Sequence, residues 1–285
     1  MSRVVYVNGR WRPHRDATVH VEDRGYQFAD GVYEVCEVRG GRLVDERRHT
    51  ERLLRSLAAL RIPLPLPIPA LSVVLHEAVR RNRLTDGILY LQVTRGVARR
   101  DHGFPPAGTR PSLVVSARRI DPVQTERTAQ AGIAVITLPE TRWARVDIKS
   151  ISLLPNVLAK QAAREQGARE AWFVDRDGYV TEGASSNAWI VTGAGAVVTR
   201  PLGPDILPGI TREVVKDALR AETLTLDERP FTVAEALGAK EAFVTAASQI
   251  VMPVVRIDGQ PIGTGIPGPV AAALRRIFHH HAEFS

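Results

Sequence analysis

The chain of 285 residues is long enough for one large domain or two of moderate size, and 44% of its residues are hydrophobic, which suffices for a core. It contains one cysteine, Cys36, and no run of about eighteen consecutive apolar residues. An internal disulfide, a cysteine-rich zinc site and a membrane span are therefore not expected. The N-terminal MSRVVYVNGRWRP lacks an apolar signal core, so we expect a cytoplasmic location.

The formal net charge of +7 raises the question of nucleic-acid binding. The arginines are scattered and accompanied by acids, as in DERRHTERLLR and AREQGARE, and no basic tract is interleaved with aromatic residues. An anionic small molecule held by arginine side chains explains the charge equally well. We therefore expect no nucleic-acid partner and keep a basic nucleic-acid-binding module as an alternative.

The first part of the chain predicts short strands, two helices and a second pair of strands. Asn8-Gly9 and Gly40-Gly41 are turn signals between alternating runs. Leucines at 53, 54, 57 and 60 recur at helical spacing and predict one buried helix face. The predicted strands lie within 4–13, 31–44, 87–96 and 111–120, the helices at 46–60 and 70–83, and an exposed loop rich in Gly, Pro and charge at 97–111.

The second part mixes strands and helices in an irregular order. Regular patterning stops after Asp121-Pro122 and resumes at GIAVITL, which predicts a domain of residues 1–120, a linker at 121–125 and a domain of residues 126–285. The irregular order predicts an α+β fold in two parts and not a doubly wound sheet. The predicted elements are a short strand at 146–150, a helix at 156–167 with Asn156 as N-cap and Gly167 as its stop, a hairpin at 170–183, strands within 187–201, 241–249 and 254–262, and helices at 209–222 and 267–281.

Lysine is rare in this chain, which has four lysines among its 38 basic residues. Lys160, Lys216 and Lys240 have polar or turn-like surroundings typical of solvated side chains. Lys149 lies instead in the β-branched run RVDIKSIS. It is either an edge-strand lysine that prevents aggregation or an amine that reacts with a carbonyl, which arginine cannot do.

Two further segments have features of an anion and ligand site. LPGITRE, residues 207–213, begins a helix with a glycine and a threonine, and free N–H groups at such an end bind phosphate well. In VTEGASSNAW, Glu182 precedes a run of small residues that lets a backbone approach a ligand. Gly209 and Thr211 are equally consistent with an ordinary turn and helix cap, and VTEGASSNAW with a turn that follows a solvated glutamate.

Taken together, these segments resemble a known family. RVDIKSISLLPNVLAKQAA, VTEGASSNAW and ILPGITRE, with VEDRGYQFADGVYEV and EAFVTAASQIVMPV, are similar in order and spacing to the fold-type IV pyridoxal-phosphate enzymes, or class IV aminotransferases. The resemblance covers nearly the whole chain. It implies a two-domain α+β fold, with a smaller N-terminal α/β domain and a larger C-terminal, β-barrel-like domain with helices.

The resemblance also implies residue roles around pyridoxal 5'-phosphate. Lys149 would hold the cofactor as a Schiff base and carry the proton, and Glu182 would face the pyridine nitrogen. Arg52 would reach the phosphate, although its helix alone suggests a solvated arginine on the polar flank. The remaining cofactor contacts implied by the family are Leu207 against the ring and Ile210, Thr211 and Ala247 near the phosphate, and the implied substrate contacts are Tyr33, Arg100, His102 and Ser185.

The loop VTRGVARRDHGFP indicates the subfamily. It resembles the Arg-x-His substrate loop of D-amino acid aminotransferases, so Tyr33, Arg100 and His102 would bind the substrate α-carboxylate. In that family the Arg and His come from the partner subunit, which implies a homodimer. We therefore expect a ping-pong transaminase that moves the amino group of D-alanine or D-glutamate to a 2-oxo acid such as 2-oxoglutarate or pyruvate. The alternatives on the same fold are a branched-chain L-amino acid or R-amine transaminase and an aminodeoxychorismate lyase.

The sequence departs from the family pattern in two places. Ala246 and Ala247 stand where hydroxyl residues often lie near the phosphate, although a backbone N–H can still bind there. Arg99 precedes the Arg-x-His pair and Asp101 stands between its two members, and both bear on the preference for acidic side chains. The three adjacent histidines near the C-terminus point in different directions on a helix, so we expect no metal site.

Overall fold

The computed structural model describes residues 3–285. The chain forms two compact units. Unit 1 comprises the N-terminal part to Asp121, Ile148–Ser152 and Glu283–Ser285, and unit 2 comprises Pro122–Asp147 and Leu153–Ala282. The α+β fold class expected from the sequence is confirmed, and the short segment with Lys149 belongs to unit 1.

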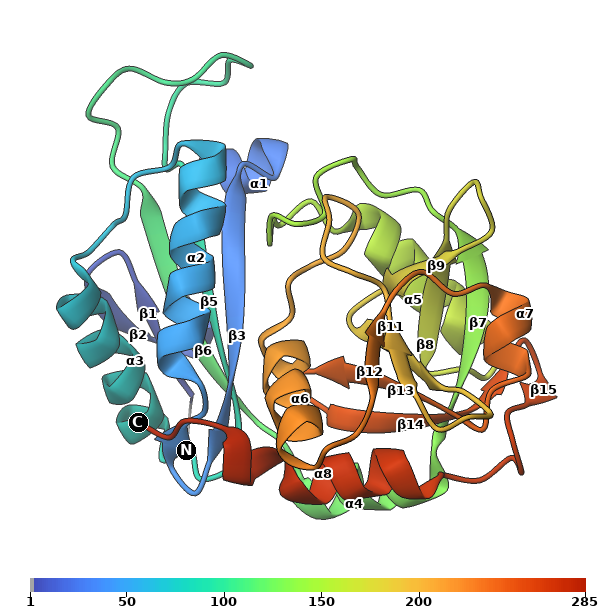
Figure 1. Cartoon of the computed structure of the whole chain (residues 1–285). Coiled ribbons are helices and arrows are strands. Elements are labelled where there is room, and N and C mark those ends of the chain that lie inside the picture. The colour runs from blue at the N-terminus through green and yellow to red at the C-terminus, as the bar shows by residue number, and fades with distance from the viewer. Residues whose placement is uncertain (1–2) are drawn as a thin grey trace. The chain divides into compact units, whose positions relative to one another are not determined.

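Unit 1 contains a fully antiparallel sheet with strand order β2-β1-β6-β5-β3-β4 (Figure 1). The turn at Asn8-Gly9 has positive φ at both residues, which suits the tight hairpin that joins β1 to β2. The elements of unit 1 are β1 (Val4–Val7), β2 (Arg10–Pro13), a 3-10 turn (His14–Asp16), α1 (Arg24–Phe28), β3 (Gly31–Arg39), β4 (Arg42–Leu43), α2 (Glu46–Leu60), α3 (Ile68–Asn82), β5 (Gly87–Thr94) and β6 (Ser112–Arg119).

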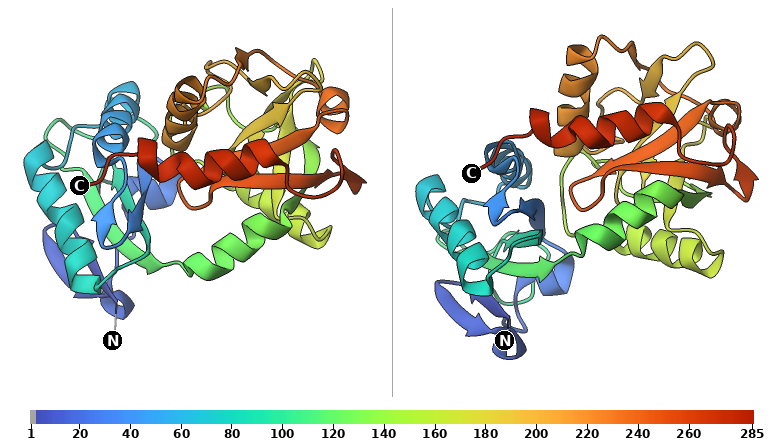
Figure 2. Two further views of the ribbon diagram at one scale, coloured as in Figure 1. Left: turned by 60° about the horizontal axis from the view of Figure 1, so that its bottom comes forward. Right: turned by 90° about the horizontal axis from the view of Figure 1, so that it is seen from below.

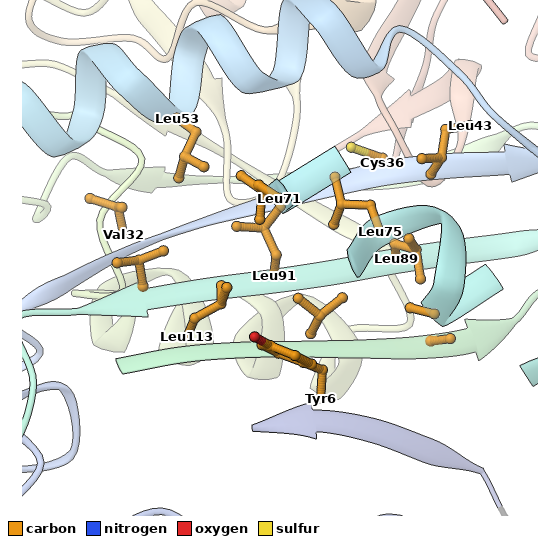
Figure 3. Close-up of a cluster of buried hydrophobic side chains, with 14 of the residues drawn as sticks. Tyr6, Val32, Cys36, Leu43, Leu53, Leu71, Leu75, Leu89, Leu91 and Leu113 are labelled. Atoms are coloured by element: carbon orange, nitrogen blue, oxygen red, sulfur yellow. The ribbon is translucent and has the colours of Figure 1, made fainter. Parts of the chain in front are cut away.

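One face of this sheet is covered by α2 and α3. Alternate residues of β3 and β5 are buried, as expected for a sheet with one covered face. Figure 3 shows the leucine side chains of both helices meeting those of the strands. The cluster includes Val32, Cys36, Leu43, Leu53, Leu57, Leu71, Leu75, Leu89, Leu91 and Leu113. By alternation Glu34 faces the helices, whereas Tyr33 lies on the opposite face.

Unit 2 contains a mixed sheet with strand order β12-β11-β10-β13-β14-β7-β8-β9, and β15 pairs with β14. The pairs β11–β12, β14–β7 and β7–β8 are parallel, and the others are antiparallel. The strands are β7 (Ile133–Pro139), β8 (Glu170–Val174), β9 (Val180–Gly183), β10 (Asn187–Val191), β11 (Val197–Thr199), β12 (Leu226–Glu228), β13 (Glu241–Ala246), β14 (Ile250–Ile257) and β15 (Gln260–Pro261).

Helices cover the sheet of unit 2. α8 packs on β13 and β14 and against α6, and α4 also contacts β14 (Figure 2). α5 packs on β7 and β8. The helices are α4 (Pro122–Ala131), α5 (Leu154–Glu165), α6 (Ile210–Ala221), α7 (Val233–Leu237) and α8 (Pro269–His281). None of the helices within residues 3–285 is long and apolar enough to cross a membrane.

Several local predictions differ from the structure. The predicted strand at 146–150 is wrong, because the N–H of Ser150 bonds to the carbonyl of Ile148 at 2.7 Å and closes a tight turn. The apolar side chain of Ile148 is buried in the core of unit 1, which explains the strand-like run. Residues 122–125, predicted as a linker, form the first turn of α4. Asn156 is not the N-cap of α5, since the helix begins at Leu154.

Candidate active site

Lys149 is held by its backbone beside β3 and α2 in unit 1. Its N–H donates to Ser56 Oγ at 3.2 Å, and its carbonyl accepts from the N–H of Tyr33 at 3.0 Å. The next residue, Ser150, forms an isolated bridge with Val32. These contacts fix the main chain on both sides of the lysine, so its side chain starts from a defined position.

The amine of Lys149 has different surroundings from the other lysines. Its Nζ lies 4.3 Å from the ring centroid of Tyr33, and within residues 3–285 it makes no ion pair. Lys160 and Lys216 instead form ion pairs with Glu170 and Glu228. Lys240 is exposed, whereas Lys149 is half-buried. A half-buried amine that is not neutralised by a carboxylate suits reaction with a carbonyl compound.

Arg52 is buried and forms a two-point ion pair with Glu34. Its Nε and Nη2 donate to the two carboxylate oxygens at 2.7 Å each, and His49 Nδ1 lies 2.7 Å from Glu34 Oε2. The expectation of a solvated arginine on the polar flank of the helix is therefore wrong. The reason is that Glu34 of β3 faces α2 and places a buried charge opposite the turn containing His49 and Arg52.

Electrostatics favour the charged form of this pair. Burial alone would raise the pKa of Glu34 above 4.5, but the charge and hydrogen bonds of Arg52, with a smaller contribution from His49, outweigh burial and lower the pKa. Burial would lower the pKa of Arg52, and Glu34 more than offsets this effect. The structure thus holds a permanent cation on the middle of α2.

Arg100 and His102 lie on the exposed loop between β5 and β6. The Arg100 guanidinium lies 5.1 Å from the ring centroid of Phe28, and the His102 ring lies 5.4 Å from the same ring. Phe28 thus brings the two predicted substrate residues together. Among the described residues, no hydrogen bond or ring contact joins either of them to Tyr33, whose ring stacks on Tyr90.

Glu182 lies at the centre of a polar group in unit 2. Its Oε1 accepts from Arg142 Nη1 at 2.5 Å, and its Oε2 accepts from Asn187 Nδ2 at 2.9 Å and from the N–H of Leu207 at 3.0 Å. Arg142 also pairs with Glu140. The buried carboxylate is therefore oriented by three donors, and hydrogen bonds of this kind favour its charged form.

Asn187 connects Glu182 to the start of α6. Its amide also donates to the carbonyl of Leu207 at 2.9 Å, and a Cβ on Gly209 would meet its Oδ1 at 2.1 Å. A side chain at position 209 would therefore displace the Asn187 amide, and the glycine expected at this helix entry leaves room for it. The first N–H groups of α6, at Ile210 and Thr211, have no side-chain cap. An uncapped N-terminus with its positive dipole end suits a phosphate.

The two remaining predicted residues lie elsewhere in unit 2. Ser185 is exposed, and its hydroxyl donates to the buried Glu170 at 2.7 Å. Ala247 lies half-buried in the turn between β13 and β14, where Gln249 N–H bonds to the carbonyl of Ala246. The substrate role of Ser185 and the phosphate role of Ala247 stay predictions.

Sequence reasoning missed Glu34, Asn187, Arg142 and Phe28, which hold or join the predicted residues. Their signal was weak, because each is one polar or aromatic residue in a strand, turn or short helix. Only the strict alternation of β3 marks Glu34, since it places an acid among buried positions of that strand.

A model of the family described as amino-transferase class IV matches residues 31–257. The chain belongs to the class IV aminotransferases. Two curated relatives are named D-alanine aminotransferase. That of Staphylococcus haemolyticus is 39% identical over 98% of both chains, and that of Bacillus licheniformis is 43% identical over 93% of this chain and 92% of its own.

A solved structure of this class IV fold has a different substrate class in its name. The branched-chain aminotransferase of the archaeon Thermoproteus uzoniensis, solved with norvaline, has a TM-score of 0.86 at 25% identity, and the match covers 98% of this chain and 94% of that chain. The fold is thus shared by aminotransferases with different substrates, and the fold alone does not assign one.

The residues present in this class IV chain fit a pyridoxal-phosphate group. Lys149 supplies an amine without a carboxylate partner in the described part of the chain. The uncapped start of α6 supplies amide donors for a phosphate, and Glu182 supplies a buried, oriented carboxylate for a protonated ring nitrogen. Each donor type matches one part of the cofactor.

Proposed function

We propose that this class IV aminotransferase uses pyridoxal 5'-phosphate to move the amino group of a D-amino acid to a 2-oxo acid. The observation that supports the chemistry is the half-buried amine of Lys149, held by its backbone and without an acid partner in residues 3–285. The choice of substrate is supported by the identity of 43% to a D-alanine aminotransferase over 93% of this chain.

Lys149 anchors the cofactor and carries the proton at the substrate Cα. The bound cofactor supplies an electron sink for the Cα carbanion. Lysine accepts the Cα proton only when its amine is neutral. The protonated amine can then donate that proton in the next step of the transfer. The tyrosine ring beside Nζ and the fixed main chain limit the positions that the amine can reach.

Glu182 and the start of α6 hold the two ends of the cofactor. Glu182 faces the ring nitrogen and keeps it protonated, while Arg142, Asn187 and the Leu207 N–H keep the carboxylate oriented. Ile210 and Thr211, with Arg52 and Ala247, bind the phosphate, and Leu207 packs against the ring. Thr211 and Arg52 are both buried, which strengthens their interaction with an anion.

The α-carboxylate of the substrate is bound by Arg100 and His102 together with Tyr33. A guanidinium fork binds two carboxylate oxygens at once. In the proposed homodimer Arg100 and His102 serve the site of the partner subunit, and Ser185 contacts the substrate. The cytoplasmic location also stays a proposal.

Half-reaction spectra test this function most clearly. The purified enzyme with its cofactor is mixed with each enantiomer of alanine and glutamate, with L-leucine and with (R)-phenylethylamine, and conversion to the aminated cofactor is followed without an acceptor. We expect conversion with D-alanine or D-glutamate that is at least about tenfold faster than with the other compounds. Faster conversion with L-leucine would favour the branched-chain alternative, which the structural likeness to a branched-chain enzyme supports.

Arg100→Ala separates carboxylate binding from the chemistry. The variant is expected to raise KM for D-alanine by about tenfold or more, because a charge-assisted pair is lost. The reaction of (R)-phenylethylamine, which has no carboxylate, is expected to stay unchanged. An equal loss for both substrates would contradict the assignment of Arg100.

A further inference from the structure

The loop of residues 95–111 between β5 and β6 is long and irregular, yet its ends meet. Connections longer than about 12–15 residues without secondary structure are uncommon and are often binding loops. Gly96 has a φ of +100°, and a Cβ there would meet the carbonyl oxygen of Arg110 at 2.0 Å. The residues from Arg99 to Phe104 are exposed, so the core does not hold the part that carries Arg100 and His102.

Arg24, the first residue of α1, reaches this loop from below the surface. Its side chain is 4% exposed, and its Nη1 donates to the carbonyl of Asp101 at 2.6 Å. Its Nη2 makes a longer contact of 3.5 Å with the carbonyl of His102. The Arg24 guanidinium also lies 4.8 Å from the ring centroid of Phe28, the ring that Arg100 and His102 share.

The backbone of the same segment holds the beginning of the loop. The N–H of Arg24 donates to the carbonyl of Gly96 at 2.9 Å, and Asp23 forms an isolated bridge with Val97. One residue thus bonds the loop through its main chain at residue 96 and through its side chain at residue 101.

Arg95 holds a second point of the loop. Its guanidinium lies 3.8 Å from the ring centroid of the exposed Phe104, and it donates to the carbonyls of Leu60 and Arg61 at the end of α2. Arg24 and Arg95 both donate to the carboxylate of Asp30, at 2.8 Å and 2.7 Å. Asp30 therefore fixes the two arginines relative to each other.

The partly buried ion pairs of Asp30 with Arg24 and Arg95 restrict the positions of both arginine side chains. Burial alone would raise the pKa of Asp30, but the hydrogen bonds from Arg95 and Arg24 outweigh this effect and lower the pKa. A carboxylate shared by two guanidinium forks leaves little freedom for either side chain. Each guanidinium then has its other donors directed at the loop or at α2.

We propose that Arg24 is a positioning residue that sets the place of Arg100 and His102 by bonding to the main-chain carbonyls beside them. This inference rests on the proposed carboxylate-binding role of those two residues. Arg24 lies on the covered side of the loop and binds no substrate itself. The hydrogen bonds of Arg24 hold the loop in place of the core packing that an exposed loop lacks. The loop then need not become ordered when the Arg100 guanidinium binds the carboxylate.

The experiment compares Arg24→Met with Arg119→Met in the full-length enzyme with its cofactor. Arg119 is the control for the loss of one arginine–carbonyl bond, because its exposed side chain donates to the carbonyl of Arg83 in the same unit. Arg24→Lys is the second variant, since it keeps a cation beside Asp30 if the methionine variant fails to fold. A single ammonium does not reproduce the fork that reaches both Asp30 and the Asp101 carbonyl.

Two readouts are measured. Amide hydrogen exchange in peptides spanning residues 97–110 is expected to become about tenfold faster in both Arg24 variants and to stay unchanged in Arg119→Met. KM for D-alanine is expected to rise by about tenfold, with kcat changed by less than about twofold. The reaction of (R)-phenylethylamine, which has no carboxylate, is expected to stay as in the wild type.

The two proposals fail separately. Exchange in a folded Arg24 variant that equals the wild type overturns the positioning role, whatever the activity. Faster exchange with an unchanged KM for D-alanine, or with an equal loss for the amine, also overturns it. A wild-type enzyme that does not convert D-amino acids contradicts the proposed function instead, and the exchange result alone then shows whether Arg24 holds the loop.

Discussion

The buried acid Glu34 shows how much one residue contributes to this site. It receives two hydrogen bonds from Arg52 and a contact from His49, with all three side chains in the interior of unit 1. Removing one partner of a buried ion pair is costly, because the other charge stays buried without compensation. Glu34 therefore compensates the buried charge of Arg52, the residue proposed to contact the phosphate.

Glu34→Gln is expected to lower the free energy of unfolding by about 3–5 kcal/mol near neutral pH. The pKa of Glu34 is lowered in the folded state, so its contribution is present above the ordinary value of 4.5 and is lost as the pH falls below it. The difference between wild type and variant should therefore shrink when urea unfolding is repeated at decreasing pH. A difference that is constant from neutral to acidic pH would contradict this account.

Glu182→Gln tests the other buried carboxylate. The amide keeps the shape but does not stabilise a protonated ring nitrogen, so the half-reaction with D-alanine should slow by about a hundredfold or more. The cofactor content should change little, because the proposed contacts of Lys149 and the start of α6 are kept. Rapid-mixing absorbance and cofactor analysis measure both quantities. A rate within twofold of the wild type would show that Glu182 has another role.

Local sequence patterns reveal some of these residues and not others. The rarity and surroundings of Lys149 set it apart from the other lysines, but only the family resemblance assigns its role. Arg52 alone looked solvated, since helical spacing does not reveal that Glu34 of β3 faces it. Arg24 bonds Asp101, 77 residues away, and Asn187 bonds Leu207, 20 residues away, and no local pattern marks such pairs.

At the scale of elements, the start of α6 combines a helix end with a close backbone approach. Gly209 lies beside Asn187, and Asn187 in turn bonds Glu182 and Leu207. A side chain at position 209 must displace the amide that holds the carboxylate. One glycine therefore affects both the phosphate end and the ring end of the proposed cofactor site.

Gly209→Ala is expected to weaken cofactor binding by about tenfold or more, because a Cβ would lie 2.1 Å from Asn187 Oδ1. Gly238→Ala at the end of α7 is the control, since its Cβ would meet only ordinary contacts at 3.7 Å. Titration of the cofactor-free variants with pyridoxal 5'-phosphate measures the effect. Equal affinities of the two variants would contradict the proposed role of this helix start.

Most elements could be predicted because they follow strong local rules. The Asn-Gly turn, the leucine spacing of α2 and the glycine before α6 each have a direct physical cause in the sequence. The strand predicted at 146–150 is wrong because its apolar residue Ile148 reaches the core of unit 1 from a turn. α4 was missed because only Ala129 on it is buried, which leaves a weak periodic signal.

At the scale of the whole molecule, the proposed homodimer predicts that two inactive variants restore each other. Lys149→Ala lacks the amine, and the double variant Arg100→Ala with His102→Ala lacks the carboxylate-binding loop residues. If the loop serves the partner's site, a mixed dimer has one site with both sets intact. Mixing after reversible dissociation should therefore restore about a quarter of the wild-type activity. Activity that does not exceed the sum of the separate variants would show that the loop serves its own subunit.

The covalent link between Lys149 and the cofactor aldehyde is the claim on which the proposed chemistry depends. The holoenzyme is reduced with borohydride, digested and analysed by peptide mass spectrometry, with Lys149→Ala as the control. We expect a pyridoxyl label on the peptide that contains Lys149 and no label at Lys160, Lys216 or Lys240. A wild-type enzyme that transaminates D-alanine but carries the label at another lysine, or at none, would contradict the account.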